Sequence, residues 1–563
     1  MKVVIVGGVA GGATAAARLR RLDENAEIVL FERSGFISYA NCGLPYYIGG
    51  VIEDEAELTL QTPERFYERF RVQVKVRHEV TAIDRAAHCV EVRDLDSGKT
   101  FREPYDKLLL APGAKPTQPP MAGTGLEGVF TLRTVEDTLR IRRFVEERKP
   151  RSAVLAGGGF IGMELAENLR ELGLDVTIVQ KPRQLMTPFD ADMAALIESE
   201  MRAHGVALRL GHTVEGFAPA GDGVQVLLQG ETPLTAGMVV LAIGVTPDSR
   251  LAAEAGLELG LRGSIAVNDR MQTSDPDIYA VGDAVQVRHA VTGQPALIAL
   301  AGPANKQGRI AADNICGGDS RYRGSQGSSV LKVFGLTAAC TGLNETAARR
   351  AGLDADAVIL SPMNHAGYYP GGSVLTMKVV FERGSGRLLG AQIVGRDGVD
   401  KRIDVLAAAI HAGMTGPGLT ELDLAYAPPY ASAKDPVNMA GYLIENLLTG
   451  KVRQFRLEDL DALPRDGSVT LLDARTPGEY SCGHAEGFRN LPLDSLREHL
   501  GELDPAKPVY VMCQSGLRSY LACRILAQHG FTCYNFAGGY RFYEAVMQER
   551  RPGGAAFPCG MDQ

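Results

Sequence analysis

The sequence predicts an α/β protein built around two strand-helix-strand units, with a third α/β segment near its C-terminus. Three observations carry this prediction. An apolar, β-branched run at 2–6 leads into the glycine-rich string Gly7–Gly12. A second such run precedes Gly157–Gly162, and a third, at 509–512, leads into a loop that begins with a cysteine. Continuous apolar runs of this kind are typical of buried parallel strands.

Composition and charge exclude several classes of protein. At 563 residues the chain is long enough for about three to four domains. The formal net charge of −8 argues against a nucleic-acid binder, and no apolar run reaches the ~18 residues of a membrane-spanning helix. The nine cysteines show no metal-ligand spacing, so no metal site is expected. Because the first strand begins at Lys2, we expect no signal peptide and a reducing, cytoplasmic location.

The first unit has the spacing of a Rossmann dinucleotide site. After the glycines an alanine-rich helix is expected to end near Leu22, and a strand at 28–31 follows. That strand ends in Glu32, twenty residues after Gly12. Glycines let a pyrophosphate approach the helix N-terminus, and the acidic residue takes the ribose hydroxyls. Val9 replaces the middle glycine of the motif, so the flanking strands and Glu32 carry the interpretation.

The second unit carries the complete G-x-G-x-x-G motif at 157–162, followed by a helix and a strand at 176–179. Gln180 closes that strand, and Lys181 and Arg183 come soon after it. Since no carboxylate repels a 2′-phosphate, NADPH is allowed and NADH is not excluded. Two dinucleotide units in one chain imply two dinucleotides that pass electrons between them.

A lone cysteine, Cys42, lies in a polar turn within 35–50, directly after the first unit. It opens a short segment that is expected to be helical, and a thiol at a helix N-terminus has its thiolate favoured. Beside a cofactor such a cysteine is a candidate redox centre, whereas a buried structural cysteine is the ordinary alternative. No second cysteine stands within forty residues, so no local disulfide can form. Its redox partner is then an oxygen species or a substrate sulfur.

Three further stretches complete a family pattern: 108–113, 239–244 and 273–283. With the two glycine motifs they resemble the two-dinucleotide flavoprotein disulfide reductases, over residues 1 to about 450. In that family the first unit binds FAD and the second binds NAD(P)H. The resemblance implies FAD contacts at Gly7, Gly8, Gly11, Gly12, Glu32, Arg33, Asn41, Pro112, Gly282 and Asp283. It implies NAD(P)H contacts at Gly157, Gly159, Phe160, Ile161, Gly162, Gln180 and Gly244.

The resemblance extends to the single-cysteine branch of this family. NADH peroxidases and oxidases of this branch cycle the cysteine through sulfenic acid, whereas coenzyme A-disulfide reductases form a mixed disulfide with coenzyme A. The peroxidases place a histidine in the first glycine loop, where this chain has Val9 and Ala10. The string Ser38–Gly43 is similar to the coenzyme A-disulfide reductase signature, with Tyr39 in place of the usual phenylalanine. The resemblance implies coenzyme A, as substrate or tightly held cofactor, at Thr14, Arg18, Arg21, Ser38, Asn41, Arg71, Asn305 and Lys434.

Residues near 320 to 445 are predicted to form an α/β domain, with strands at 373–382 and 388–394 and a helix at 399–412. The family makes homodimers through this domain. Two tyrosine-bearing loops resemble those that reach the partner subunit's active site, which implies catalytic roles for Tyr368 and Tyr426. A phenol can protonate a departing thiolate, and interface packing is the alternative role.

The C-terminal segment resembles a rhodanese domain. The strings 469–480 and 483–487 precede a predicted strand at 509–512. Cys513 is the residue directly after that strand. Backbone N–H groups at the helix N-terminus, together with Arg518, are expected to stabilise Cys513 as thiolate and persulfide. Four residues separate Cys513 from Arg518, whereas related phosphatases have five, so we interpret the loop as a sulfur carrier.

These patterns predict two Rossmann-like dinucleotide-binding domains, an α/β dimerisation domain and a C-terminal rhodanese domain. The expected boundaries are 1–115 with 245–322 for FAD, 116–244 for NAD(P)H, 323–447 for dimerisation, 448–458 for a linker and 459–555 for rhodanese. The expected function is FAD-dependent NAD(P)H reduction of coenzyme A persulfide, polysulfide or coenzyme A disulfide through Cys42, coupled to sulfur transfer by Cys513. The alternatives are an NADH oxidase that acts through a Cys42 sulfenic acid, and a redox-sensing or sulfur-delivery protein.

Overall fold

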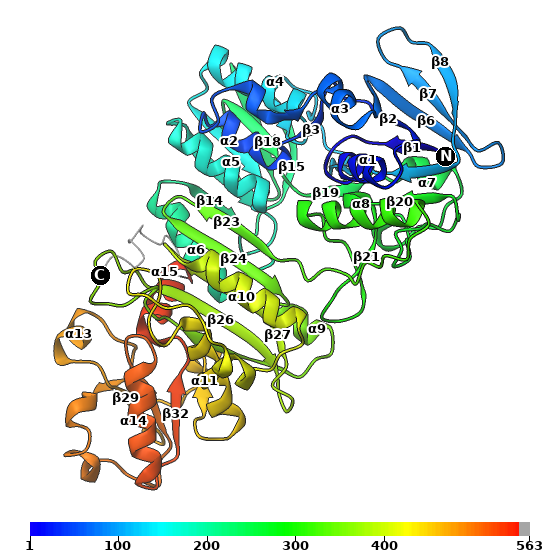
Figure 1. Ribbon diagram of the computed structural model, residues 1–563. Coiled ribbons are helices and arrows are strands. Elements are labelled where there is room, and N and C mark those ends of the chain that lie inside the picture. The colour runs from blue at the N-terminus through cyan, green and yellow to red at the C-terminus, as the bar shows by residue number, and fades with distance from the viewer. Residues whose placement is uncertain (551–563) are drawn as a thin grey trace. The chain divides into compact units, whose positions relative to one another are not determined.

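The computed structural model describes residues 1–550 of the 563-residue chain (Figure 1). The chain forms two compact units. Unit 1 comprises 1–183 and 206–327, and unit 2 comprises 184–205 and the residues from 328 onward. Within residues 1–550 no helix has the length and apolar composition needed to cross a membrane, and no cluster of His, Cys, Asp and Glu could hold a metal ion.

The first glycine motif lies in a five-stranded parallel sheet of unit 1, with the strand order β20-β9-β1-β2-β5. The strand predicted at 2–6 and the helix predicted to end near Leu22 are confirmed as β1 (Lys2–Val6) and α1 (Ala10–Leu22). Four of the five strands are mostly buried, the edge strand β5 is only partly so, and α1 packs against α8 (Ala301–Ile315). The other strands are β2 (Glu27–Glu32), β5 (Gln73–Val76), β9 (Lys107–Leu110) and β20 (Ile278–Ala280).

The second glycine motif lies in a parallel sheet of the same kind, with the order β11-β18-β12-β13-β14. The helix predicted after 157–162 and the strand predicted at 176–179 are confirmed as α5 (Phe160–Glu171) and β13 (Asp175–Gln180). The other elements are β11 (Val129–Thr131), α4 (Val135–Arg148), β12 (Ser152–Ala156), β14 (Ala207–Leu210) and β18 (Met238–Leu241). An antiparallel sheet of β15 (Val214–Ala220), β16 (Gly223–Leu228) and β17 (Leu234–Ala236) shares its apolar core.

Unit 2 contains an antiparallel sheet with the order β23-β24-β27-β26-β25. The strands predicted at 373–382 and 388–394 are confirmed as β26 (Leu375–Glu382) and β27 (Leu388–Gly395), and the predicted helix as α10 (Val399–His411). Helix α10 packs on β24 and β27. The other elements are β23 (Ser329–Val333), β24 (Leu336–Gly342), α9 (Glu345–Arg350), β25 (Ala355–Leu360) and α11 (Pro436–Leu448).

The C-terminal part of unit 2 is a parallel sheet with the order β28-β32-β31-β29-β30. Helix α14 (Leu517–Gln528) packs on it. The stretch expected as a linker, 448–458, contains β28 (Gln454–Phe455), which pairs with β32 and so belongs to this sheet. The expected domain end at 555 lies outside the described residues. The remaining elements are β29 (Thr470–Asp473), α13 (Pro477–Cys482), β30 (Arg489–Asn490), β31 (Val509–Met512), β32 (Cys533–Phe536) and α15 (Gly539–Arg550).

A buried ion network joins three segments of unit 2. Lys378, which is 3% exposed, lies 2.8 Å from Glu345 and 2.9 Å from Asp192. Glu345 also accepts a 2.5 Å bond from Arg456, the residue after β28. Burial opposes ionisation of Glu345, yet the charges of Lys378 and Arg456 prevail and lower its pKa to about 2. Asp192 belongs to α6 (Ala191–Ala203), so the network links the segment 184–205, the dimerisation sheet and the start of the rhodanese sheet.

Candidate functional site

The first glycine turn forms a cradle at the ends of β1 and β2. Gly7 has a φ of +98°, and a Cβ there would collide with the carbonyl of Ala111. The N–H of Gly8 donates to the Glu32 carboxylate at 2.8 Å, so the acidic residue is held beside the turn. Only a side-chain-free turn leaves room for a diphosphate at the N-terminus of α1, and the chain therefore fits a dinucleotide here.

The second glycine turn repeats this geometry. Gly157 has a φ of +116°, and the N–H of Gly158 donates to the Gln180 side-chain oxygen at 3.0 Å. An amide thus replaces the carboxylate of the first unit at the same place. Gly244 follows β18, so all seven expected NAD(P)H residues lie at the C-terminal ends of β12, β13 and β18 or at the start of α5. That edge is where open parallel sheets bind nucleotides.

Cys42 lies in a 3-10 turn, Asn41–Gly43, and is exposed. The short helix α2 (Leu44–Ile48) follows it and packs against α5 of the second glycine unit. The charged groups that act on the thiol are Glu164, Arg133 and Asp283. Within unit 1 the cysteine therefore lies in the electrostatic range of the expected flavin aspartate, Asp283, and of Glu164 on the nicotinamide helix α5.

The expectation that a helix terminus favours the Cys42 thiolate is wrong. Desolvation by the surrounding protein raises the pKa of Cys42, the Glu164 carboxylate adds to this, and Arg133 only partly opposes it. The physical reason is that α2 has five residues, too few for a strong terminal dipole, while Glu164 lies close by.

Sequence reasoning missed Glu164 and Arg133. Burial, with the neighbouring Glu167, raises the pKa of Glu164 to about 7, and the Tyr46 hydroxyl is hydrogen-bonded to it. An acidic residue two positions after the last motif glycine could have drawn attention to Glu164. Arg133 belongs to no motif, and the fold alone brings its guanidinium to 2.7 Å from Asp283.

The residues expected to contact coenzyme A fall in both units. In unit 1, the Thr14 hydroxyl donates to Asn305 across the α1–α8 contact, and Arg18 forms a 2.7 Å ion pair with Asp313. Arg71 ends α3 (Pro63–Phe70) in the left-handed conformation. The expected contacts in unit 1 thus lie along α1, α8, the Cys42 turn and the end of α3, and Lys434 is exposed in unit 2.

The two expected tyrosines meet in unit 2. Their hydroxyls are 2.8 Å apart, and Tyr368 is 76% exposed while Tyr426 is 47% exposed. The hydrogen bond between the two hydroxyls raises the pKa of Tyr426. Tyr368 lies in the loop between β25 and β26, and Tyr426 lies in the loop before α11, so the pair is assembled from segments about sixty residues apart.

Cys513 directly follows β31 and is fully buried. Its sulfur accepts hydrogen bonds from the N–H of Gly516 and the hydroxyl of Ser519, each at 3.2 Å. Both Nη groups of Arg518 donate instead to Glu479, at 2.7 and 2.6 Å. This hydrogen bonding holds the pKa of Glu479 at about 2. Sequence reasoning gave Ser519 and Glu479 no role; a hydroxyl beside Arg518 in the first helical turn was the available signal.

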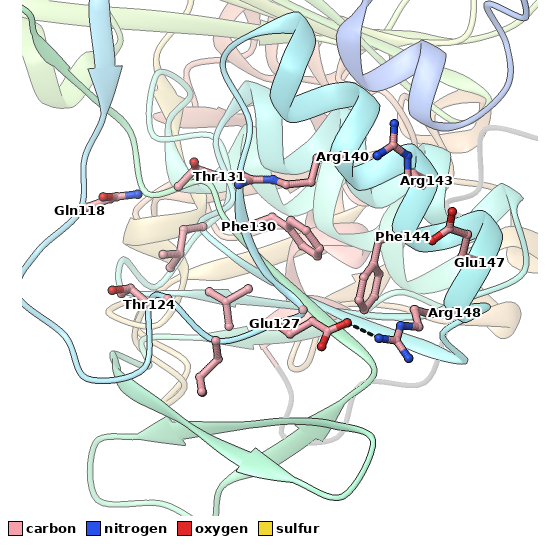
Figure 2. Close-up of a pocket in the computed structure, with 15 residues that line it drawn as sticks. Gln118, Thr124, Glu127, Phe130, Thr131, Arg140, Arg143, Phe144, Glu147 and Arg148 are labelled. Atoms are coloured by element: carbon pink, nitrogen blue, oxygen red, sulfur yellow. Dashed lines mark hydrogen bonds and ion pairs between the residues drawn. The ribbon is translucent and has the colours of Figure 1, made fainter. Parts of the chain in front are cut away.

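A separate cavity of about 580 Å³ lies between the edge strand β11 and α4 of unit 1 (Figure 2). Phe130 and Phe144 face each other in it, and Arg148 pairs with Glu127 at one end. None of the expected site residues lines this cavity.

Three family models match the chain. The model described as pyridine nucleotide-disulphide oxidoreductase matches residues 1–308. The dimerisation domain of the same group matches 328–436, and the rhodanese-like domain matches 456–545.

Similar proteins cover most or all of the chain. The coenzyme A disulfide reductase of Staphylococcus aureus strain JH9 is 36% identical over 442 residues, 78% of this chain and 99% of the relative. The structure of reduced Bacillus anthracis CoADR-RHD is 47% identical, with a TM-score of 0.95 over 98% of both chains. An NAD-dependent persulfide reductase from A. fulgidus is 37% identical, with a TM-score of 0.91 over 96% of this chain and 100% of that one.

Proposed function

Since this chain belongs to the pyridine nucleotide-disulphide oxidoreductase family, we propose that it reduces coenzyme A persulfide, polysulfide and coenzyme A disulfide through Cys42. The family implies FAD and NAD(P)H. We further propose that Cys513 carries sulfane sulfur for this reaction. The observation that carries the proposal is the setting of Cys42: a lone thiol that feels the charges of Asp283 in the first glycine unit and Glu164 in the second, and is followed by α2, which packs against α5.

The two glycine cradles fit the two dinucleotides. The first would hold FAD through the turn at Gly7, with Glu32 at the ribose and Asp283 further along the cofactor. The second would hold NAD(P)H through the turn at Gly157, with Gln180 beside it. When bound, FAD supplies a two-electron relay between the nicotinamide and the cysteine.

The proposed sulfur step takes place on Cys42. Its thiolate attacks the sulfur of coenzyme A persulfide that is bonded to coenzyme A, which forms a Cys42–coenzyme A disulfide and releases hydrosulfide. Two electrons then cleave this disulfide into the Cys42 thiolate and coenzyme A thiolate, and one proton completes the coenzyme A thiol. Because the Cys42 pKa is raised, this thiolate needs help from its surroundings, and Arg133 is the cation that acts on it.

The proton for the departing thiolate is assigned to the tyrosine pair. A phenol that donates to another phenol is already oriented, and the exposure of Tyr368 leaves it free to reach a second chain. The match to a dimerisation domain supports a homodimer in which Tyr368 and Tyr426 serve the partner subunit's active site.

The Cys513 loop of the rhodanese-like domain favours coenzyme A persulfide over coenzyme A disulfide as the main substrate. Cys513 has two donors at its sulfur, from Gly516 and Ser519, which suit a thiolate and the persulfide formed on it. A reductase of disulfides alone has no use for a sulfane carrier.

Mass spectrometry of the purified protein tests the proposal directly. We expect FAD and coenzyme A in the native protein, and a coenzyme A adduct on the Cys42 peptide after non-reducing digestion.

A second candidate function is supported by the likeness to the water-forming NADH oxidase of Lactobacillus brevis, 29% identical with a TM-score of 0.77. Oxygen uptake that matches NAD(P)H consumption without any sulfur substrate would favour the NADH oxidase function over sulfur reduction.

A further inference from the structure

Arg402 is a fully buried cation on α10, with 1% of its surface exposed. Its Nη2 group donates to the Asn364 carbonyl at 2.7 Å, to the Tyr430 carbonyl at 3.4 Å and to the Asp435 carboxylate at 3.0 Å. Nη1 donates to the Gly398 carbonyl at 3.1 Å. A single guanidinium thus binds three separate stretches of backbone and one buried carboxylate.

Each of these partners lies next to a residue of the proposed function. Asn364 is four positions before Tyr368, and Tyr430 is four positions after Tyr426. Asp435, which is 2% exposed, directly follows Lys434. Arg402 is therefore the common anchor of both tyrosine loops and of the turn that carries the expected coenzyme A lysine.

The loops themselves offer the tyrosines little support at their tips. Tyr368 is 76% exposed, so packing does not fix its ring. Order has to come from the loop bases, where the Ala366 N–H donates to the Ala431 carbonyl at 3.1 Å, beside the Arg402 contacts. The 2.8 Å distance between the two phenol oxygens is set by the relative position of these bases.

We propose that Arg402 is a positioning residue for sulfur reduction, which holds the two loops so that the hydroxyls of Tyr368 and Tyr426 meet. This inference rests on the proposed function. Arginine suits the task because its planar fork serves several acceptors at once, whereas a lysine ammonium is a single point on a flexible stem. A buried ion pair contributes little net stability and more to a defined arrangement, which is the role assigned to Arg402 and Asp435.

The test compares Arg402→Lys with Asp404→Asn, a change on the exposed face of the same helix, in the FAD-loaded dimer. Stopped-flow reduction of the flavin by NAD(P)H should be unchanged in both variants, because unit 1 carries that step. Oxidation of the reduced enzyme by coenzyme A persulfide should slow about ten- to a hundredfold in Arg402→Lys alone, the size of effect that a small misplacement of a catalytic group produces. If Arg402→Lys does not yield a stable dimer, Asp435→Asn removes the same anchor from the other side.

A double-mutant comparison separates the positioning role from a merely structural one. Tyr368→Phe should slow the oxidation step, and Arg402→Lys should then add little further loss in the Tyr368→Phe background. Losses that multiply, or equal slowing of flavin reduction, would overturn the inference and leave the proposed function intact. Wild-type oxidation rates in Tyr368→Phe and Tyr426→Phe would instead remove the tyrosine role from the proposed function, and the inference with it.

Discussion

Arg518, five positions after Cys513, donates both of its Nη groups to the Glu479 carboxylate, at 2.7 and 2.6 Å. The charge of Arg518 is thus already compensated by the Glu479 carboxylate in the absence of substrate. The direct donors to the sulfur are the Gly516 N–H and the Ser519 hydroxyl. The Cys513 sulfur thus receives two short-range hydrogen bonds, while Glu479 partly screens the charge of Arg518.

Glu479→Gln should release this screening. With the carboxylate gone, the Arg518 charge acts undiminished on Cys513 and favours the thiolate, which is the form that reacts, so alkylation of Cys513 should become severalfold faster. Mass spectrometry of the Cys513 peptide after alkylation across pH measures this rate. Glu486→Gln, an exposed change in the same domain, is the control, and an alkylation curve identical to it would contradict the account.

Ser519→Ala should have the opposite effect. It removes one of the two hydrogen bonds at the Cys513 sulfur, and bonds to charged groups are worth about 1.5–3 kcal/mol. Alkylation of Cys513 should therefore slow, and sulfur transfer from a persulfide donor should slow about tenfold or more. Ser481→Ala, whose hydroxyl donates to the Gly478 carbonyl at 2.8 Å and not to Cys513, should leave both rates unchanged.

Glu164→Gln tests the electrostatic setting of Cys42. Desolvation by the surrounding protein, and then the Glu164 carboxylate, raise the pKa of Cys42, so a neutral amide at position 164 should lower it. The effect should be largest above about pH 7, where Glu164 with its pKa of about 7 is ionised, and should vanish below it. Cys42 alkylation rates across pH give the measurement. Glu171→Gln at the exposed end of α5 serves as the comparison, and equal curves for the two variants would refute this prediction.

The ion network around Lys378 should govern the acid stability of unit 2. The folded-state pKa of Glu345 is about 2, below its ordinary value of 4.5, so its contribution is present above pH 4.5 and is lost as the pH falls toward 2. Lys378→Met leaves buried carboxylates without their cation and should cost about 3–5 kcal/mol of stability. Denaturant midpoints from pH 3 to 7 test this, with the exposed Lys332→Met as control. A midpoint in Lys378→Met that matches the control would contradict the role of the network.

The elements that could be predicted from the sequence are those with a local signal. Apolar runs and glycine spacing are properties of adjacent residues, and they identified β1, α1, α5 and β13. The paired roles of Glu32 and Gln180 also follow from spacing, and each accepts a hydrogen bond from the second glycine of its own turn.

The features that could not be predicted depend on tertiary distance. Arg133 is hydrogen-bonded to Asp283, which lies 150 positions away in the sequence. Lys378 is hydrogen-bonded to Asp192, which lies 186 positions away. The raised pKa of Cys42 likewise depends on desolvation by the surrounding protein and then on Glu164, neither of which a local pattern reveals. The helix-terminus argument for Cys42 failed because it considered only the segment that follows the cysteine and not the helix packed against it.

Single-turnover reaction of the NAD(P)H-reduced enzyme with coenzyme A persulfide tests the central claim most directly. The wild-type protein should release one hydrosulfide per active site, with re-oxidation of the flavin, and should pass through a Cys42–coenzyme A disulfide that acid quenching and mass spectrometry detect. Cys42→Ser should accept electrons from NAD(P)H but form no adduct and release no hydrosulfide. A Cys42→Ser enzyme that turned over the persulfide at the wild-type rate would contradict the account.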